Sequence, residues 1–117
     1  MPFKFESLHV WHDAMDLNDK IHLLTKQYFP KDEQFVLSPQ IRRDSDSIVL
    51  NIAEGCTGQS NATFKNFLNY SLRSGIEVVS CLFIARRRNY IDEDLFRSLY
   101  NEIEILSKKI TALRNTL

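Results

Sequence analysis

Apolar residues recur along this chain at alternating spacings of three and four positions, which is the repeat of an amphipathic α-helix. The first such run predicts a helix over residues 8–28, whose apolar face holds Val10, Ala14, Leu17, Ile21, Leu24 and Tyr28. Pro30 has no amide donor and disfavours a helical conformation in the residue before it, so we expect the helix to end there. We expect Phe35 and Leu37 to pack the following loop onto the core.

A second helix is predicted over residues 38–54. Ser38 and Pro39 suit its start, because a serine hydroxyl caps free amides and proline fits the first helical position. Gly55 suits the left-handed residue that ends many helices. We therefore expect a helix with a defined cap at each end.

Two more helices are predicted over residues 61–88 and 92–115. Asp92 is placed to cap the last helix, and Ile91 and Phe96 occupy the positions of a hydrophobic staple across its start. The chain contains only 3 glycines and 3 prolines, which favours long uninterrupted helices. Four amphipathic helices joined by short loops predict a single all-α domain over residues 1–117, folded as an antiparallel up-down-up-down four-helix bundle.

The second and third predicted helices carry more apolar surface than one core requires. The additional residues, which lie beside the main apolar seams, are Val49, Leu50, Ala53, Leu72, Ile76, Val79 and Phe83. One explanation is that a central helix touches three neighbours and buries both of its apolar rows. We prefer a second explanation, an interface between copies of the chain, because a complete apolar row left in water promotes association.

The charge balance limits what the protein attracts over a distance. Lys+Arg number 15 and Asp+Glu also number 15, so attraction to a polyanion has to come from local clusters. The candidate nucleic-acid contacts are Arg42, Arg43, Arg73, Arg86, Arg87 and Arg88. The last three also suit the C-terminal end of a helix, where cations offset the helix dipole, and this structural role is the favoured one. Arg42 and Arg43 are as well suited to ion pairs with Asp44 or Asp46.

Five polar residues of the second and third helices form a candidate polar network. Ser47, Asn51 and Glu54 share one face at spacings of four and three. Arg73 and Glu77 lie one turn apart. Because buried polar groups need hydrogen-bond partners, we interpret these residues as a structural network rather than as a chemical site.

The sequence contains no motif of a known catalytic or cofactor site, so we predict no enzyme, cofactor, metal or small-molecule substrate. Small helical RNases often carry an arginine followed shortly by a histidine, whereas all three histidines here precede Arg42. An unrecognised RNase is kept as a second alternative. The residues at metal-like helical spacing are His9, His12, Asp13 and Asp16, but no cysteine or third histidine is nearby in the sequence, which argues against a metal site.

The cellular compartment follows from the cysteines and from the hydropathy. Cys56 and Cys81 form no CxxC pair, and the first residues lack the pattern of a signal peptide. The longest uncharged apolar stretch, Val78–Ala85, is far shorter than the ~20 residues that span a bilayer. We expect a cytoplasmic protein that does not associate with membranes.

Several segments together resemble the family of bacterial four-helix-bundle proteins first noted as reading frames in intervening sequences of 23S rRNA genes. The matching segments are Leu8–Trp11, Tyr28–Pro30, Gln40–Arg43, Ser47–Gly55, Phe67–Leu68, and Leu72–Ser74 with Glu77. The segment Ser47–Gly55 is the most specific, because it looks like the family pattern S-I-x-x-N-I-A-E-G. The resemblance covers nearly the whole chain.

The resemblance implies a left-handed antiparallel bundle that assembles into a ring-shaped homopentamer. A related branch comprises accessory proteins of diversity-generating retroelements, which bind a reverse transcriptase and nucleic acid. This chain departs from the usual pattern at Val36, at Asp44 and in the loop Gly55–Ser60, which carries no arginine. The missing arginine and the zero net charge disfavour polyanion binding.

We therefore predict a non-enzymatic, homo-oligomeric and pentameric scaffold whose work is binding. The first alternative is an accessory protein that uses its arginines to bind RNA or DNA, together with a protein partner such as a reverse transcriptase.

Overall fold

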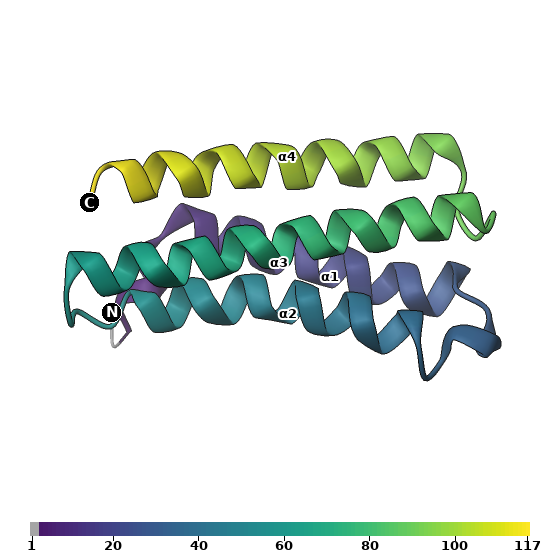
Figure 1. The fold of residues 1–117 in the computed structure, drawn as a ribbon, viewed down its shortest axis with the longest axis horizontal. Helices are drawn as coiled ribbons and strands as arrows, with labels where there is room; N and C mark the ends of the chain where they lie inside the picture. Colours follow the sequence, from purple (N-terminus) through teal and green to yellow (C-terminus); the bar gives the residue numbers. More distant parts are fainter. Residues whose placement is uncertain (1–2) are drawn as a thin grey trace.

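Four long helices form the body of the protein in the computed structural model, which describes residues 3–117 (Figure 1). They are α1 (His9–Tyr28), α2 (Leu37–Gly55), α3 (Asn61–Arg87) and α4 (Glu93–Asn115). Two short 3₁₀ helices, η1 (Lys4–Ser7) and η2 (Lys31–Glu33), precede α1 and α2. Consecutive helices run in opposite directions along a bundle of 43 × 23 × 21 Å, which confirms the predicted all-α antiparallel fold (Figure 1). The predicted domain also includes Met1 and Pro2, which lie outside the described residues.

The core is built from the apolar seams that the sequence predicts. α3 lies between α2 and α4, and its residues Leu68, Val78 and Leu82 are completely buried (Figure 1). α1 contributes Leu17 and Ile21, which are buried to the same degree. Burying one such side chain stabilises the fold by roughly 1.5–3 kcal/mol, so these seams fix how each helix is rotated.

Local signals set most of the helix ends. Phe29 is extended (φ −81°, ψ 133°) in front of Pro30, and α1 ends there as predicted. The Asp92 carboxylate accepts a hydrogen bond from the Leu95 amide at 2.8 Å and caps α4. Ser60 does the same for α3, accepting from the Thr63 amide at 3.0 Å.

The predicted caps of α2 are wrong at both ends. The helix begins at Leu37, so Ser38 is a buried residue of its first turn and Val36 precedes the helix without a side-chain cap. Gly55 is the last helical residue rather than a left-handed cap, and Gly58 has the positive φ of 91° instead. The reason for a glycine at position 55 is the close approach of α3, where an added Cβ would lie 2.5 Å from the Phe67 Cβ.

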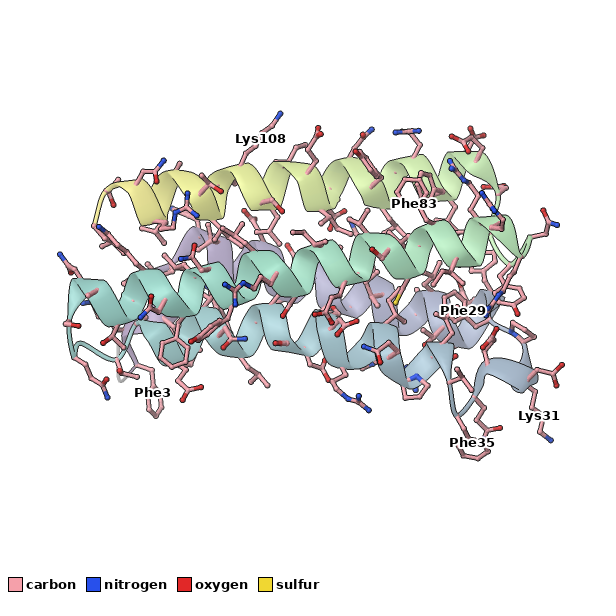
Figure 2. All side chains as sticks on the ribbon, in the orientation of Figure 1. Phe3, Phe29, Lys31, Phe35, Phe83 and Lys108 are labelled. Carbon is pink, nitrogen blue, oxygen red and sulfur yellow. The ribbon has the colours of Figure 1, made fainter. Side chains whose placement is uncertain are left out.

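The loop between α1 and α2 is held by a polar residue rather than by Phe35. Glu33 is only 6% exposed and accepts hydrogen bonds from Tyr90 Oη and from Arg88 Nη1, both at 2.6 Å. Leu37 is buried as predicted, but Phe35 is 85% exposed, so the prediction for Phe35 is wrong. With Glu33 in the inner position, the next turn of the chain directs Phe35 outward (Figure 2).

Candidate self-association surface on α3 and α4

An apolar groove lies between α3 and α4 on the surface of the bundle. It has a volume of about 280 Å³ and is lined by Gly75, Ile76, Val79, Ser80, Phe83, Tyr100, Ile103, Glu104 and Ser107. Ile76 is 66% exposed and Phe83 is 45% exposed, which is high for side chains of this size. The groove therefore presents apolar surface that the monomer does not cover.

Three of the seven residues predicted as an interface line this groove, namely Ile76, Val79 and Phe83. α3 thus carries two apolar rows, one for the core and one for the groove. The other wall comes from α4, which the sequence did not indicate. Phe83 contacts that wall, with its ring centroid 4.8 Å from Phe96 and 6.3 Å from Tyr100.

The remaining predicted interface residues lie elsewhere; they are Val49, Leu50, Ala53 and Leu72. Val49 is only 7% exposed, so burial within the bundle is the correct explanation for it. Leu72 packs against the core, and Ala53 is half-buried. Leu50 is 63% exposed on α2 but does not line the groove.

Cations stack on the aromatic rings at one end of the groove. The Arg86 guanidinium lies 3.9 Å from the centroid of the Phe96 ring, within the range of a cation–π contact. Arg97 lies 5.0 Å from the Tyr100 ring. Both arginines also pair with Glu93, at 2.7 Å and 3.4 Å, so this end of the groove carries charge that is partly neutralised.

The six candidate arginines do not converge on one patch. Arg88 pairs with Glu33, as Arg86 does with Glu93, and both ion pairs join the C-terminal end of α3 to another segment. Arg42 donates through Nε to Thr25 Oγ1 at 2.7 Å rather than to Asp44 or Asp46.

Arg73 lies 5.8 Å from the Tyr70 ring. Arg43 and Arg87 are exposed, and within residues 3–117 neither forms a side-chain hydrogen bond or an ion pair. These two are the least engaged of the six.

Comparison with known proteins places the chain in a family. The model of the 23S rRNA-intervening sequence protein family matches residues 6–112. The chain belongs to this family. It is also 30% identical to a protein with unknown function from the S23 ribosomal protein family of Bacteroides thetaiotaomicron VPI-5482, whose crystal structure superposes with a TM-score of 0.82 over 90% of this chain and 97% of that one. The comparison with curated proteins gave no match.

In this 23S rRNA-intervening sequence protein, the segment Ser47–Gly55 packs against α3. Asn51 Nδ2 donates to the Ser47 hydroxyl at 2.9 Å, and Ser74 of α3 donates to that same hydroxyl at 2.9 Å. Ser71 Oγ donates to the Ile48 carbonyl at 2.9 Å across the same contact. The polar residues of the segment therefore bind α2 to α3.

The predicted polar network is only partly assembled. Ser47 bonds to Asn51 and to Ser74 of α3. Glu54 and Arg73 are exposed and bond to neither Ser47 nor Asn51 within residues 3–117. Glu77 faces the Asp44 carboxyl instead. A hydrogen bond that the protonated Glu77 donates to Asp44, repulsion by the Asp44 charge and desolvation together raise the pKa of Glu77.

Asp44 heads a polar cluster that the sequence did not indicate. Asp44 is only 5% exposed, and its carboxylate accepts a hydrogen bond from Gln40 Nε2 at 3.0 Å. Burial, followed by the charges of Asp44 and Glu77, raises the pKa of the Cys81 thiol to about 11. The spacing of four between Gln40 and Asp44, and again between Glu77 and Cys81, was the available signal.

A second polar cluster joins α1 to α2. Asp46 Oδ1 accepts from Asn18 Nδ2 at 2.7 Å and from His22 Nε2 at 3.0 Å. Asn18 also donates to the buried Ser45 hydroxyl at 3.1 Å. These side chains satisfy one another across the helix contact, as structural polar groups do.

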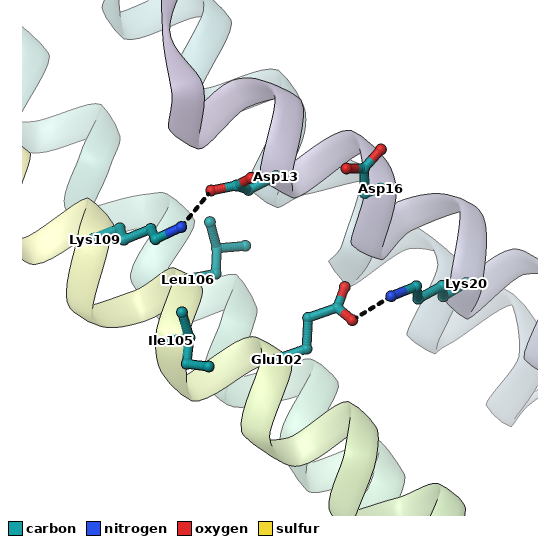
Figure 3. A pocket seen from close by; sticks show the side chains of 7 residues that line it. All are labelled: Asp13, Asp16, Lys20, Glu102, Ile105, Leu106 and Lys109. Carbon is teal, nitrogen blue, oxygen red and sulfur yellow. Dashed lines mark hydrogen bonds and ion pairs between the residues drawn. The ribbon is translucent and has the colours of Figure 1, made fainter.

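The contact between α1 and α4 is polar and contains a hollow (Figure 3). Lys20 pairs with Glu102 at 2.6 Å, and Lys109 pairs with Asp13 at 3.1 Å. Two of the four residues at metal-like spacing have other partners: Asp13 is in this ion pair, and His12 Nε2 binds the Glu6 carbonyl at 2.7 Å. No cluster of three or more metal-binding side chains occurs within residues 3–117.

Over the part of the chain that the structure describes, none of the helices combines the length and the apolar character needed to cross a membrane.

Proposed function

We propose that this protein is a non-catalytic scaffold that assembles into a homo-oligomer through the groove between α3 and α4. The observation that carries the proposal is the exposure of Ile76 and Phe83 in one continuous apolar hollow. Exposed apolar patches of this kind, rimmed by polar residues, mark interaction surfaces. The resemblance to ring-forming relatives supports an assembly of five copies.

The polar groups support a structural role rather than chemistry. Asp46 is occupied by Asn18 and His22, and Arg42 is bound to Thr25, so the groups that could act on a substrate stabilise helix contacts instead. This arrangement suits a scaffold, because paired polar groups fix the helices in place. The apolar groove is then the surface through which the protein binds.

Light scattering on protein eluting from a sizing column tests the proposal directly. We expect the wild-type mass to be a multiple of the 13.7 kDa chain, with five copies as the specific expectation. Ile76→Asp should reduce the mass, because it places a charge in the apolar contact. Leu50→Asp is the matched control, since Leu50 is equally exposed but lies outside the groove. A monomeric wild type would refute the proposal.

A second candidate function is the binding of single-stranded nucleic acid near the end of α3. A hollow of about 370 Å³ there is lined by Phe83, Ile84, Arg86, Arg87 and Arg88. Exposed aromatic rings beside cations are the usual platform for stacked bases and phosphates. This candidate ranks second because Arg86 and Arg88 are already paired with carboxylates and the net charge is zero.

The same elution experiment separates the two candidates when absorbance is recorded at 260 and 280 nm. Excess absorbance at 260 nm, removed by raising the salt concentration, would favour nucleic-acid binding. Arg87→Ala should then weaken binding, whereas Arg43→Ala on α2 serves as the control for loss of one exposed cation. Cleavage of added RNA that survives both substitutions would indicate a contaminating nuclease.

A further inference from the structure

The loop before α2 presents two adjacent apolar side chains to solvent. Phe35 is 85% exposed and Val36 is 66% exposed, the two highest values among the exposed large hydrophobic residues together with Ile76. We call this pair the knob. Large side chains in such a position are unfavourable in water unless another surface covers them.

The knob is held in place rather than loosely attached. The Val36 amide donates to the Glu33 carbonyl at 3.1 Å, and the Gln34 amide donates to the Lys31 carbonyl at 3.0 Å. Glu33 is in turn anchored by Arg88 and Tyr90. A pre-ordered apolar projection loses little conformational freedom when it binds, which is a property of interface anchors.

The groove between α3 and α4 has room for the knob. Its volume is about 280 Å³, whereas an apolar cavity of about 150 Å³ already accommodates a benzene ring. The groove can therefore take the phenyl ring of Phe35 together with the smaller side chain of Val36. Its lining is apolar apart from the serine hydroxyls, Tyr100 and Glu104, which suits these two residues.

The knob and the groove lie on opposite edges of the bundle. Figure 2 shows Phe35 projecting beyond α2, while Phe83 marks the groove on the far side of α3, next to α4. Because α2 and α3 stand between them, the knob does not reach the groove of its own chain. A second copy can supply what each surface lacks.

We propose that the knob of one copy docks into the groove of the next. This inference rests on the proposed function, since it specifies how the homo-oligomer is held together. A contact between two different surfaces of the same chain is repeated from copy to copy, and it closes into a ring when the rotation between copies permits.

The charges beside the two surfaces are complementary. Lys31 and Asp32 flank the knob, and Glu104 and Lys108, which pair at 3.8 Å, flank the groove. Each side offers one cation and one anion. Docking can therefore pair Lys31 with Glu104 and Asp32 with Lys108. Such rim charges orient the partners more than they add affinity.

Removal of the knob tests the inference by mass. Phe35→Asp should reduce the assembly to monomers, as Ile76→Asp does on the groove side, while Leu50→Asp leaves the mass unchanged. All three residues are exposed, so the variants should keep the thermal unfolding midpoint of the monomer fold. A wild type that is oligomeric while Phe35→Asp keeps the same mass would overturn the docking but leave the proposed function standing.

Cysteine cross-linking tests which surfaces meet. Val36→Cys combined with Ser80→Cys in one chain should give, on mild oxidation, a ladder of covalent multimers up to the full assembly. Neither single variant should cross-link, because a knob meets a groove and never another knob. The native Cys56 and Cys81 are buried and should not interfere. Dimers formed by Val36→Cys alone, or no ladder from the double variant of an oligomeric protein, would refute the docking.

Discussion

A methyl group at Gly55 of α2 would lie 2.5 Å from the Cβ of Phe67 in α3, and 3.1 Å from the Phe64 ring. The first of these distances is too short for any relaxed contact, and a Cβ atom cannot rotate away. Gly55→Ala should therefore destabilise the protein by roughly 1–3 kcal/mol, the usual effect of overpacking, despite the better helix propensity of alanine. Urea unfolding followed by circular dichroism, at one fixed protein concentration, measures the change.

Gly75→Ala is the comparison at a looser helix contact, where α3 faces α4. An added Cβ there would meet Ser107 at 3.7 Å and Ile103 at 3.8 Å, which are ordinary contact distances. We expect stabilisation by about 0.4–1 kcal/mol, because alanine restricts the unfolded chain more than glycine does. A neutral Gly55→Ala would contradict the close approach of α2 and α3, and destabilisation by Gly75→Ala would contradict the space described between α3 and α4.

The Glu33 anchor predicts a pH-dependent contribution to stability. Hydrogen bonds from Tyr90 and Arg88, with the Arg88 charge, hold the pKa of Glu33 below its ordinary value of 4.5, although burial acts in the opposite direction. A lowered folded pKa means that the contribution is present above pH 4.5 and is lost as the pH falls through the folded value. Glu33→Gln should therefore lower the urea midpoint at pH 7, and the difference from wild type should shrink below pH 4.5.

Glu54→Gln provides the control, since Glu54 is exposed and forms no ion pair within residues 3–117. Its midpoint should follow that of the wild type at every pH. A difference between Glu33→Gln and wild type that stays constant from pH 7 to pH 3 would show that the charge of Glu33 is not what holds the loop.

The contact between α1 and α4 should be the part of the bundle most sensitive to salt. Lys20 and Glu102 are both partly exposed, and such pairs contribute roughly 0.2–1 kcal/mol. A double-mutant cycle with Lys20→Ala and Glu102→Ala should give a coupling in that range at low salt. The coupling should approach zero at about 1 M salt, where the screening length falls to roughly 3 Å.

The buried pair of Glu33 and Arg88 is the comparison for that cycle, because burial of one partner limits screening. Its coupling should persist at the salt concentration that abolishes the Lys20–Glu102 coupling. If both coupling energies fell equally with salt, burial of Glu33 would not be what limits screening of its ion pair.

Cys81 should be unreactive in the folded protein. It is 5% exposed, and burial with the nearby Asp44 and Glu77 charges raises the pKa of its thiol to about 11, so the thiolate is scarce at neutral pH. In a Cys56→Ser background, a thiol reagent at pH 7.5 should label Cys81 only at the rate of unfolding, and urea should make labelling immediate. Rapid labelling of the native protein would contradict the described packing of Cys81.

The fold follows from the sequence because its signals are local. Pro30 and Asp92 act on their immediate neighbours, and the apolar period together with such end signals predicts the four helices to within two residues of their observed ends. The start of α2 was misplaced because Ser38 resembles a cap by composition. Its burial depends on which helices pack around it, and that information is not local.

The groove follows from the sequence only in part. Ile76 and Phe83 stand out as a second apolar row on α3, but Val49 and Leu50 show the limit of such reasoning. Their side chains point about 100° apart around the axis of α2. Which of the two is buried therefore depends on how α2 is rotated against its neighbours. The pairing of Arg86 with Glu93, which removes a candidate phosphate contact, depends in the same way on how two helices meet.

The hydrogen bond from Ser71 to the Ile48 carbonyl has a consequence for motion. A slide of one helix along the other by one turn, about 5.4 Å, would separate this pair and also the serines at positions 47 and 74. α2 and α3 are thus fixed in register and move as one body. Hydrogen bonds from Asn18 to Asp46 and from Arg42 to Thr25 hold α1 to α2 in the same way. We therefore expect slow rearrangements of the protein, such as those seen by relaxation dispersion, to displace α4 along the other helices.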